Sequence, residues 1–404
     1  MAANAPDPRY AVTARTPPRK GITLSWRDPK FRAIVWQIVI IGAIGGSLWY
    51  LILNTATNLA ARHIATGFAF LGRTAGIPIG EHMIDYDPAV DTYGQAVLVG
   101  ILNTLRISVV GVILTTILGT AVGIAQLSKN WMLAKLSAAY VEFLRDIPVL
   151  LQLLFWYTLV HALPVVRQAW NPIPGIFVSN RGLLFPTLIW ENAHSWALGA
   201  FLVGAGITYM YRRRASRTQA ATGIRPRVWP VAVALLLLVP ALVWATMGAP
   251  YALDIPVKRG FNFQGGSGVS PEYIALLVGL VLYTSTYAAE IVRTGIQSVP
   301  AGQWEAAGAL GLRRGTVLRK VVLPQALRVI IPPMTSTYLS IAKNSSLAVA
   351  IGYQDVVSIV NTILNQTGQA IEGIALIMGV YLSISLGISL FMNWYNARIA
   401  LVER

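Results

Sequence analysis

The sequence predicts an all-α integral membrane protein with about eight transmembrane helices. Its 404 residues are 55% hydrophobic and only 12% charged, which is far more apolar than an average soluble domain. Apolar stretches of about 20 residues, the length that crosses roughly 30 Å of hydrocarbon as a helix, recur along the chain. Lys and Arg concentrate in every second loop between these stretches. Together these observations indicate a multi-pass membrane protein.

Eight apolar stretches are the predicted spans. They cover about residues 33 to 53, 97 to 127, 137 to 161, 195 to 211, 229 to 247, 272 to 292, 334 to 351 and 374 to 396. Residues 1–32 are basic and rich in proline, so they predict a disordered cytoplasmic tail instead of a signal peptide. The small residues after the first stretch, "NTATNLAAR", leave signal cleavage there as an alternative.

The distribution of basic residues orients the chain, because cytoplasmic loops carry an excess of Lys and Arg. One set of alternate segments contains 23 of them and consists of residues 1–32, 128–136, 212–227, 293–328 and 397–404. The other set has six, which are Arg62, Arg73, Arg167, Arg181, Lys258 and Arg259. We therefore expect both termini in the cytoplasm. The net charge of +16 follows membrane sidedness, which argues against nucleic-acid binding.

Motifs that would support catalysis are missing from the sequence. Cysteine is absent, and the four histidines (His63, His82, His161 and His194) are scattered without an H-E-x-x-H pattern. No G-x-S-x-G nucleophile motif or G-x-x-x-x-G-K-[ST] nucleotide loop occurs. The sequence thus predicts a protein that is not an enzyme, binds no cofactor itself and would draw any ATP-derived energy from another chain.

Residues 302–326, "GQWEAAGALGLRRGTVLRKVVLPQA", predict a short cytoplasmic helix. Pro300 and Gly302 suit its start and Gly311 its end, which leaves about three turns. A helix this short is marginal alone, so it must pack against something else. Its small face suits a groove on a partner protein, although packing on its own membrane helices is the alternative. That face and its rim consist of Gln303, Ala306, Ala307, Leu310, Arg313 and Arg314.

The spacing of Glu305, Ala306, Ala307, Gly311, Val321, Leu323 and Pro324 resembles the EAA loop of binding-protein-dependent ABC importer permeases. In that family the short coupling helix sits in a cleft of the ATPase subunit. Other stretches resemble polar amino-acid permeases: "GILNTLRISVVGVILTTILGT", "YVEFLRDIPVLLQLLFWY", "YAAEIVRTGIQSVPAGQWEAAGALGL" and "AKNSSLAVAIG". The enlarged layout is similar to that of general L-amino-acid permeases, which pair with a second, different permease subunit.

The resemblance implies a type I importer permease with additions. The predicted parts are the tail (1–32), an extra first helix with its periplasmic loop (33–96), a core in two pieces (97–163 and 271–396, with the EAA loop at 298–326), a two-helix insertion (164–270) and a cytoplasmic end (397–404).

The resemblance also implies amino-acid import into the cytoplasm across a bacterial inner membrane. The implied partners are an ABC ATPase dimer holding ATP and Mg²⁺, a second permease subunit, a periplasmic amino-acid-binding protein and the bilayer. A secondary transporter or channel for small polar solutes is the alternative.

Polar residues inside two spans are candidates for a substrate pathway. Glu290 lies three residues before Arg293, which fits either a local ion pair or part of a polar path. Lys343 and its polar successors interrupt the seventh span, as a broken transporter helix, a polar helix contact or an early helix end would. The candidate pathway residues are Thr284, Ser285, Thr286, Glu290, Asn344, Ser345 and Ser346.

Overall fold

A computed structural model describes residues 26–27, 29–61, 66–224 and 226–399, so most of the predicted tail and the last five residues lie outside it. The chain divides into two units, residues 1–67 and 68–404. In the first unit, α1 (Pro29–Ala61) is a 33-residue helix that contains the first predicted span. Among the described residues, five helices are long and apolar enough to cross a membrane, or up to seven if each bent helix pair is one span.

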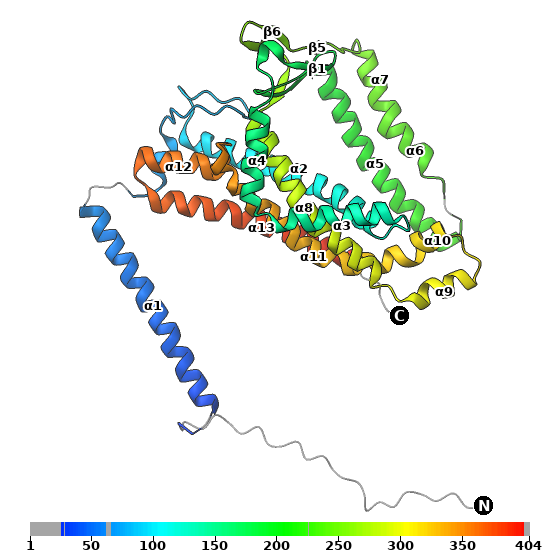
Figure 1. Cartoon of the computed structure of the whole chain (residues 1–404), viewed down its shortest axis with the longest axis horizontal. Coiled ribbons are helices and arrows are strands. Elements are labelled where there is room, and N and C mark those ends of the chain that lie inside the picture. The colour runs from blue at the N-terminus through cyan, green and yellow to red at the C-terminus, as the bar shows by residue number, and fades with distance from the viewer. Residues whose placement is uncertain (1–25, 28, 62–65, 225, 400–404) are drawn as a thin grey trace, which may run out of the picture. The chain divides into compact units, whose positions relative to one another are not determined.

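The second unit is a helical bundle centred on α8 (Pro271–Gln297), which matches the sixth predicted span. Helix α8 packs against α2 (Tyr93–Gln126), α4 (Val149–His161) and α11 (Leu323–Asn344) (Figure 1). The last helix, α13 (Ala370–Ile399), lies along α11 and contains the eighth predicted span. The buried side chains of α8 therefore form much of the bundle core.

Helices α2 and α8 touch at two glycines that the sequence places four residues apart. A Cβ at Gly119 would overlap the side chain of Ala288, and one at Gly123 would overlap the carbonyl oxygen of Ala289. Small residues allow this close backbone approach, and in a membrane such contacts supply much of the packing energy between helices. The Gly119–Gly123 pair thus fixes how α2 lies on α8.

The third predicted span, 137 to 161, is wrong as a single helix. Residues there form α3 (Trp131–Asp146) and α4, which meet at 102°. Pro148 explains the break, because the residue before a proline avoids the helical region and Ile147 is extended at φ −88° and ψ 125°.

The seventh predicted span, 334 to 351, starts too late. Helix α11 begins at Leu323 and contains Pro332 and Pro333 in its interior. It is preceded by α10 (Arg314–Val317) and the π-helical η5 (Leu318–Val322), and a 3-10 segment, η6 (Ser345–Ile351), follows it. After a 51° bend comes α12 (Val356–Thr367), which the sequence analysis did not predict. Prolines can lie within membrane helices because neighbouring groups satisfy the freed carbonyls.

The segment 164–270 contains a helical hairpin. Its first arm is α5 (Asn192–Thr222), which is longer than the predicted 195 to 211 and is not among the apolar candidate spans of the described chain. Its second arm is α6 (Trp229–Val233), the π-helical η4 (Ala234–Leu238) and α7 (Val239–Thr246), as predicted for 229 to 247. Gly204 of α5 lies so close to the carbonyl of Leu235 that a Cβ would overlap it.

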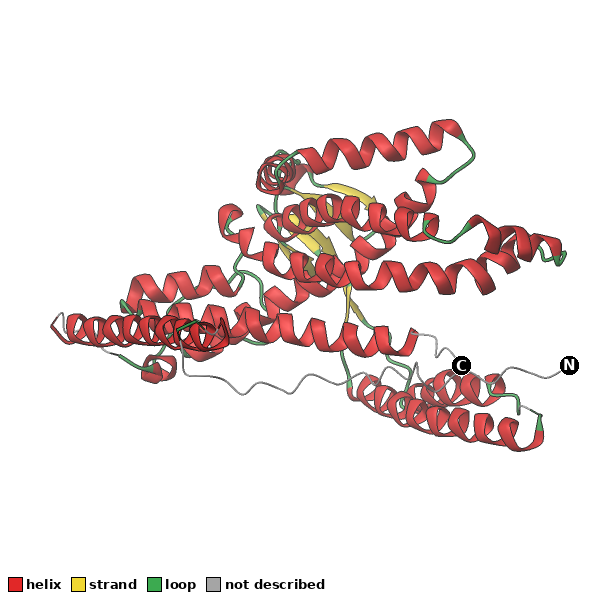
Figure 2. Ribbon diagram, turned by 90° about the horizontal axis from the view of Figure 1, so that it is seen from below, coloured by secondary structure: helices red, strands yellow, loops and turns green. Residues whose placement is uncertain are grey.

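Short strands lie at one end of this hairpin (Figure 1). They were not predicted, so all-α describes only the helical body, and Figure 2 shows them in yellow among the red helices. One antiparallel sheet has the order β1-β2-β3-β8, from Trp170–Ile173, Ile176–Ser179, Gly182–Phe185 and Ser267–Val269. Strand β4 (Thr187–Leu188) pairs with β5 (Leu253–Asp254), and β6 (Val257–Arg259) pairs with β7 (Asn262–Gln264). Because β1 follows α4 and β8 precedes α8, this sheet joins the ends of two core helices.

We expect Gly119→Ala to destabilise the bundle, because the added methyl group must push α2 away from α8. Overpacking of this kind costs about 1–3 kcal/mol, which should lower the thermal unfolding temperature of the detergent-solubilised protein. Gly387→Ala is the matched control, because nothing lies within 4 Å of a Cβ built at Gly387 of α13. Equal unfolding temperatures for the two variants would contradict the close α2–α8 contact.

Candidate functional site

The predicted short helix of the EAA loop is present as α9, Ala301–Ala309. Pro300 precedes it in an extended conformation, and Gly311 ends it at φ +67°, a conformation that glycine adopts without strain. The N–H of Gly311 donates to the carbonyl of Gly308 at 2.9 Å. The start and end of this helix are therefore those that the sequence predicts.

Helix α9 is attached to the bundle by one of its faces. Ala307 is buried, and Trp304 packs against the same cluster, whose members come from α8, α10, η5 and α11. The prediction that Ala307 lies on the docking face with Ala306 is wrong, because Ala307 faces the protein's own core. This contact stabilises α9, which is too short to be stable without packing against other elements.

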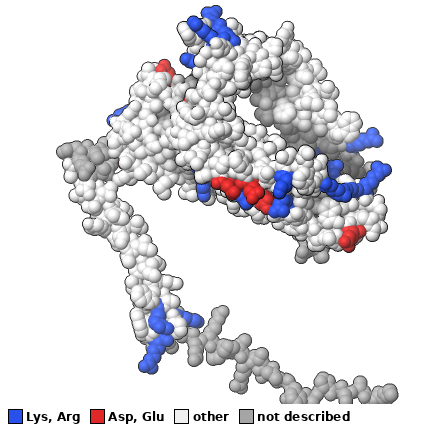
Figure 3. All heavy atoms as spheres, viewed as in Figure 1, with Lys and Arg blue, Asp and Glu red and all other residues white. Residues whose placement is uncertain are grey.

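The opposite face of α9 is open. Gln303, Glu305 and Ala306 are exposed, and Leu310 is 78% exposed. Arg313 and Arg314 follow at the start of α10 and are exposed as well, and Figure 3 shows both basic and acidic side chains over this end of the bundle. Leu323 and Pro324 begin α11, where Leu323 is exposed and Pro324 is half-buried. The exposed surface is small, carries only a methyl group at Ala306 and is flanked in the sequence by the charged side chains of Glu305 and Arg313.

A second candidate site is a polar pocket of about 560 Å³ between α8 and α11. It contains three of the predicted pathway residues, Thr284, Glu290 and Asn344. The other lining residues are Arg145, Tyr283, Tyr287, Ile291, Pro333, Ser336, Thr337 and Ser340. Four of the predicted pathway residues lie elsewhere, namely Ser285, Thr286, Ser345 and Ser346.

The four excluded hydroxyls bond to nearby groups. Ser285 Oγ lies 2.8 Å from the Tyr140 hydroxyl, and Thr286 Oγ1 donates to the Tyr283 carbonyl at 2.7 Å. Ser345 and Ser346 donate to carbonyls three residues earlier. Ser345 and Ser346 thus bond to backbone carbonyls where α11 becomes η6.

The pocket has an internal ion pair and an unsatisfied hydroxyl. Glu290 bonds to Arg293 through both carboxylate oxygens, and Arg293 Nη1 donates to Gln297 Oε1 at 3.1 Å. The local ion pair is therefore present, and it lies at the pocket wall. Thr284 is only 3% exposed, and its Oγ1 has no hydrogen-bond partner among the described residues. A buried hydroxyl without a partner is costly, so a ligand or water in the pocket would stabilise it.

Several pocket residues were not predicted from the sequence, although helical spacing could have found them. Tyr283 and Tyr287 are four residues apart on α8, as are Ser336, Ser340 and Asn344 on α11. These polar positions form one face of each helix. Arg145 also reaches the pocket, because α3 ends beside α8.

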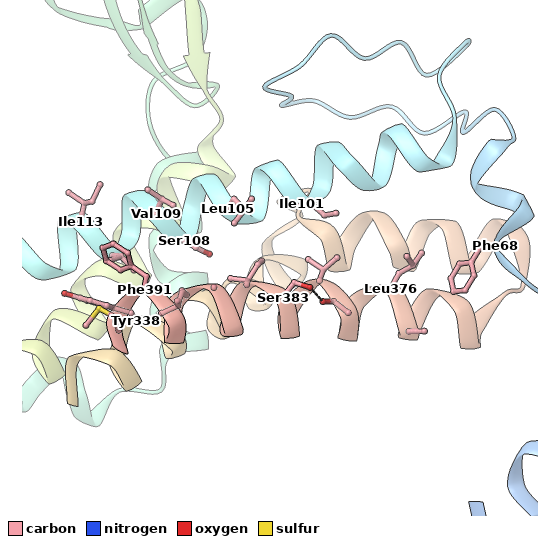
Figure 4. A pocket seen from close by; sticks show the side chains of 18 residues that line it. Phe68, Ile101, Leu105, Ser108, Val109, Ile113, Tyr338, Leu376, Ser383 and Phe391 are labelled. Atoms are coloured by element: carbon pink, nitrogen blue, oxygen red, sulfur yellow. Dashed lines mark hydrogen bonds between the residues drawn. The ribbon is translucent and has the colours of Figure 1, made fainter. Parts of the chain in front are cut away.

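A larger cavity, of about 1010 Å³, lies among α2, α11 and α13 (Figure 4). Its lining is almost wholly apolar, and the hydroxyl of Ser383 is already bonded to the Gly379 carbonyl at 2.7 Å. Such a surface offers nothing to a charged or zwitterionic solute. The polar pocket is therefore the better candidate for a polar substrate.

Residues 116–401 match the family model described as the binding-protein-dependent transport system inner membrane component. The chain belongs to this family. It is 49% identical over 384 residues to the putative amino-acid ABC transporter permease protein YhdX of Escherichia coli, covering 95% of this chain and 98% of that one. It is 47% identical over 396 residues to the general L-amino acid transport system permease protein AapQ of Rhizobium johnstonii, covering 96% and 98%.

A third relative is the glutamate/glutamine/aspartate/asparagine transport system permease protein BztB of Rhodobacter capsulatus. It is 40% identical over 427 residues, covering 97% of this chain and 99% of that one. The matches cover the insertion as well as the core. The chain is thus a multi-pass inner membrane transport component.

Replacing Glu290 should separate the structural from the functional meaning of the ion pair. An exposed or half-exposed pair contributes about 0–1 kcal/mol, so Glu290→Gln should change the unfolding temperature little. Because Arg293 would lose its carboxylate at the pocket wall, we expect the KM for substrate uptake to rise several-fold in proteoliposomes. Glu372→Gln, outside the pocket on α13, is the control. Unchanged uptake by Glu290→Gln would show that the Glu290–Arg293 ion pair is only a local contact within α8.

Proposed function

We propose that this chain is the transmembrane permease subunit of an ATP-driven importer that carries amino acids from the periplasm to the cytoplasm. The observation that carries the proposal is the construction of α9, which is anchored through Ala307 and leaves Gln303, Ala306 and Leu310 exposed. A small, rigid and exposed face of this kind fits a groove on another protein. The partner on this face is the ATPase subunit, and ATP with Mg²⁺ is bound there and not by this chain.

The names of the relatives support amino acids as substrates, and the polar pocket offers matching chemistry. An amino acid has a carboxylate and an ammonium group, and the pocket is lined by Arg145 and Glu290 together with tyrosine, serine and threonine side chains. Charge-assisted hydrogen bonds to both ends would hold the common part of any amino acid. Such recognition suits polar substrates or a broad range of L-amino acids.

The distribution of Lys and Arg supports the orientation, with both termini and α9 in the cytoplasm. The complete transporter then contains this chain, a second permease subunit, an ATPase dimer and a periplasmic amino-acid-binding protein. Purification of the full-length tagged chain from native membranes tests this composition, because mass spectrometry identifies the chains that accompany it. Uptake that persists after removal of the ATPase would instead indicate a secondary transporter or channel.

Two neighbouring alanines of α9 allow a matched test of the coupling face. Ala306→Trp places a large side chain on the exposed face, so we expect a normal unfolding temperature but loss of ATPase association and of uptake. Ala307→Trp forces the same side chain into the buried cluster, so we expect a lower unfolding temperature, by roughly the cost of overpacking, about 1–3 kcal/mol.

Thermal unfolding and co-purification of the ATPase measure the two effects separately. Gln219→Trp, on the exposed end of α5, controls for a surface tryptophan. Normal ATPase association and uptake by Ala306→Trp would overturn the assignment of this face.

A further inference from the structure

Four cations gather around the β6–β7 hairpin at one end of the insertion, and we call them the hairpin cluster. Figure 3 shows Lys and Arg side chains over β6. The hairpin cluster consists of Arg167, Arg181, Lys258 and Arg259, and all four residues are exposed. They come from three separate stretches of the insertion, so the fold and not the local sequence assembles them.

Contacts other than ion pairs hold three of these cations in place. The guanidinium of Arg167 lies 4.1 Å from the ring centre of Phe261, and Arg181 Nη1 donates to Asn262 Oδ1 at 3.3 Å. Lys258 Nζ donates to the Ala169 carbonyl at 3.2 Å and lies 5.2 Å from the ring centre of Phe177. Cation–π contacts and neutral acceptors position these charges without neutralising them.

No carboxylate neutralises the hairpin cluster within the described part of the chain. The ion pairs seen there join Glu81 to Arg106, Glu272 to His161 and Glu290 to Arg293. The insertion has two acidic residues, Glu191 and Asp254, and Asp254 accepts from the Gly266 N–H at 2.8 Å. Like charges held together repel one another, so the cluster would gain stability from carboxylates supplied by a second molecule.

Two exposed aromatic rings belong to the segments that carry the hairpin cluster. Phe261 is 72% exposed at the hairpin turn, and Trp170 of β1 is 57% exposed. Arg, Trp and Phe side chains in this combination are typical of protein–protein interfaces, where a few of them supply most of the binding energy. The surface is therefore suited to a folded protein and not to a single small anion.

We propose that the hairpin cluster is the docking surface for an acidic face of the soluble binding protein. This inference rests on the proposed function, which places the hairpin on the periplasmic side. Figure 1 shows β6 beyond the ends of α4, α5 and α7, so the hairpin stands away from the helices that the bilayer covers. A surface in that place meets soluble proteins more readily than lipid headgroups.

Electrostatic docking has a measurable signature, because charged surfaces accelerate association and salt screens them. The experiment uses the complete complex in nanodiscs and the binding protein that co-purifies with it. The Kd of that binding protein is measured at 50 and 500 mM KCl for the natural complex, for Lys258→Glu/Arg259→Glu and for Arg167→Gln/Arg181→Gln. Arg212→Gln/Arg213→Gln is the matched control, since it removes two cations from the other end of the same insertion.

We expect Lys258→Glu/Arg259→Glu to weaken binding about tenfold or more at 50 mM KCl, mainly through slower association. Arg167→Gln/Arg181→Gln should weaken binding several-fold. For both variants, the difference in Kd from the natural complex should shrink at 500 mM KCl. The control should stay within about twofold of the natural complex. Basal ATPase activity should be unchanged in every variant, which shows that the complexes are assembled.

Unchanged affinity in both hairpin variants, with uptake intact, would overturn the docking surface and leave the proposed function standing. A loss that occurs only in phosphatidylglycerol nanodiscs, and not in phosphatidylcholine, would identify lipid headgroups as the partner and overturn it too. Equal weakening of binding by Arg212→Gln/Arg213→Gln would show a general effect of net charge and would also overturn the docking surface. Absence of any binding protein from the purified complex would contradict the proposed function itself.

Discussion

The close contact of α2 with α8 is the constraint on which the rest of the bundle depends. Glycines at 119 and 123 let the two backbones approach until a single methyl group would overlap Ala288 or the carbonyl of Ala289. Lipid chains are as apolar as the helix surfaces, so close packing of this kind, and not hydrophobic burial, holds membrane helices together. It leaves α8 rigidly seated, and every candidate site in the second unit contacts α8 or is joined to one of its ends.

Helix α8 connects three places that a transporter must coordinate. Its first turn follows β8, its middle carries Thr284 at the pocket, and its last turns carry Glu290 and lead into α9. The buried cluster that anchors Ala307 contains Ala288 and Val292 of α8 together with Ala326, Ile330 and Met334 of α11. The helices that form the two pocket walls and α9 therefore share one buried apolar cluster.

The sequence predicted those elements that local chemistry determines. Proline and glycine set the ends of α9, and apolar length identified α1, α2, α8 and α13, because both signals act within a few residues. The break between α3 and α4 was also readable, since Pro148 excludes a helical Ile147. The apolar length of the stretch, taken alone, did not reveal this break. In contrast, Pro332 and Pro333 lie inside α11, where the neighbouring helices, and not the local sequence, decide whether the helix continues.

Which residues belong to each candidate site depends on tertiary contacts, and no local sequence pattern determines those contacts. Ala306 and Ala307 are identical neighbours, and only the buried cluster decides which one is exposed. Ser285 and Thr284 are likewise adjacent, yet Tyr140 bonds to Ser285 while Thr284 Oγ1 is left unsatisfied in the pocket wall. The hairpin cluster was visible in the sequence only as six basic residues on the outer side, and strand pairing was needed to collect four of them.

The position of the sheet explains why an insertion in the middle of a permease core need not disturb it. Strand β1 begins nine residues after the end of α4, and β8 ends two residues before α8 begins, so the sheet closes the gap between two helices that already pack together. Strand β3 pairs with β8 over Leu183 to Phe185, which ties the β2–β3 turn to the start of α8. The β6–β7 hairpin is a separate two-stranded sheet, and the hydrogen bond from Lys258 Nζ to the Ala169 carbonyl links it to the residue before β1. Helix α8 thus runs from the four-stranded sheet at one end to the loop that precedes α9 at the other.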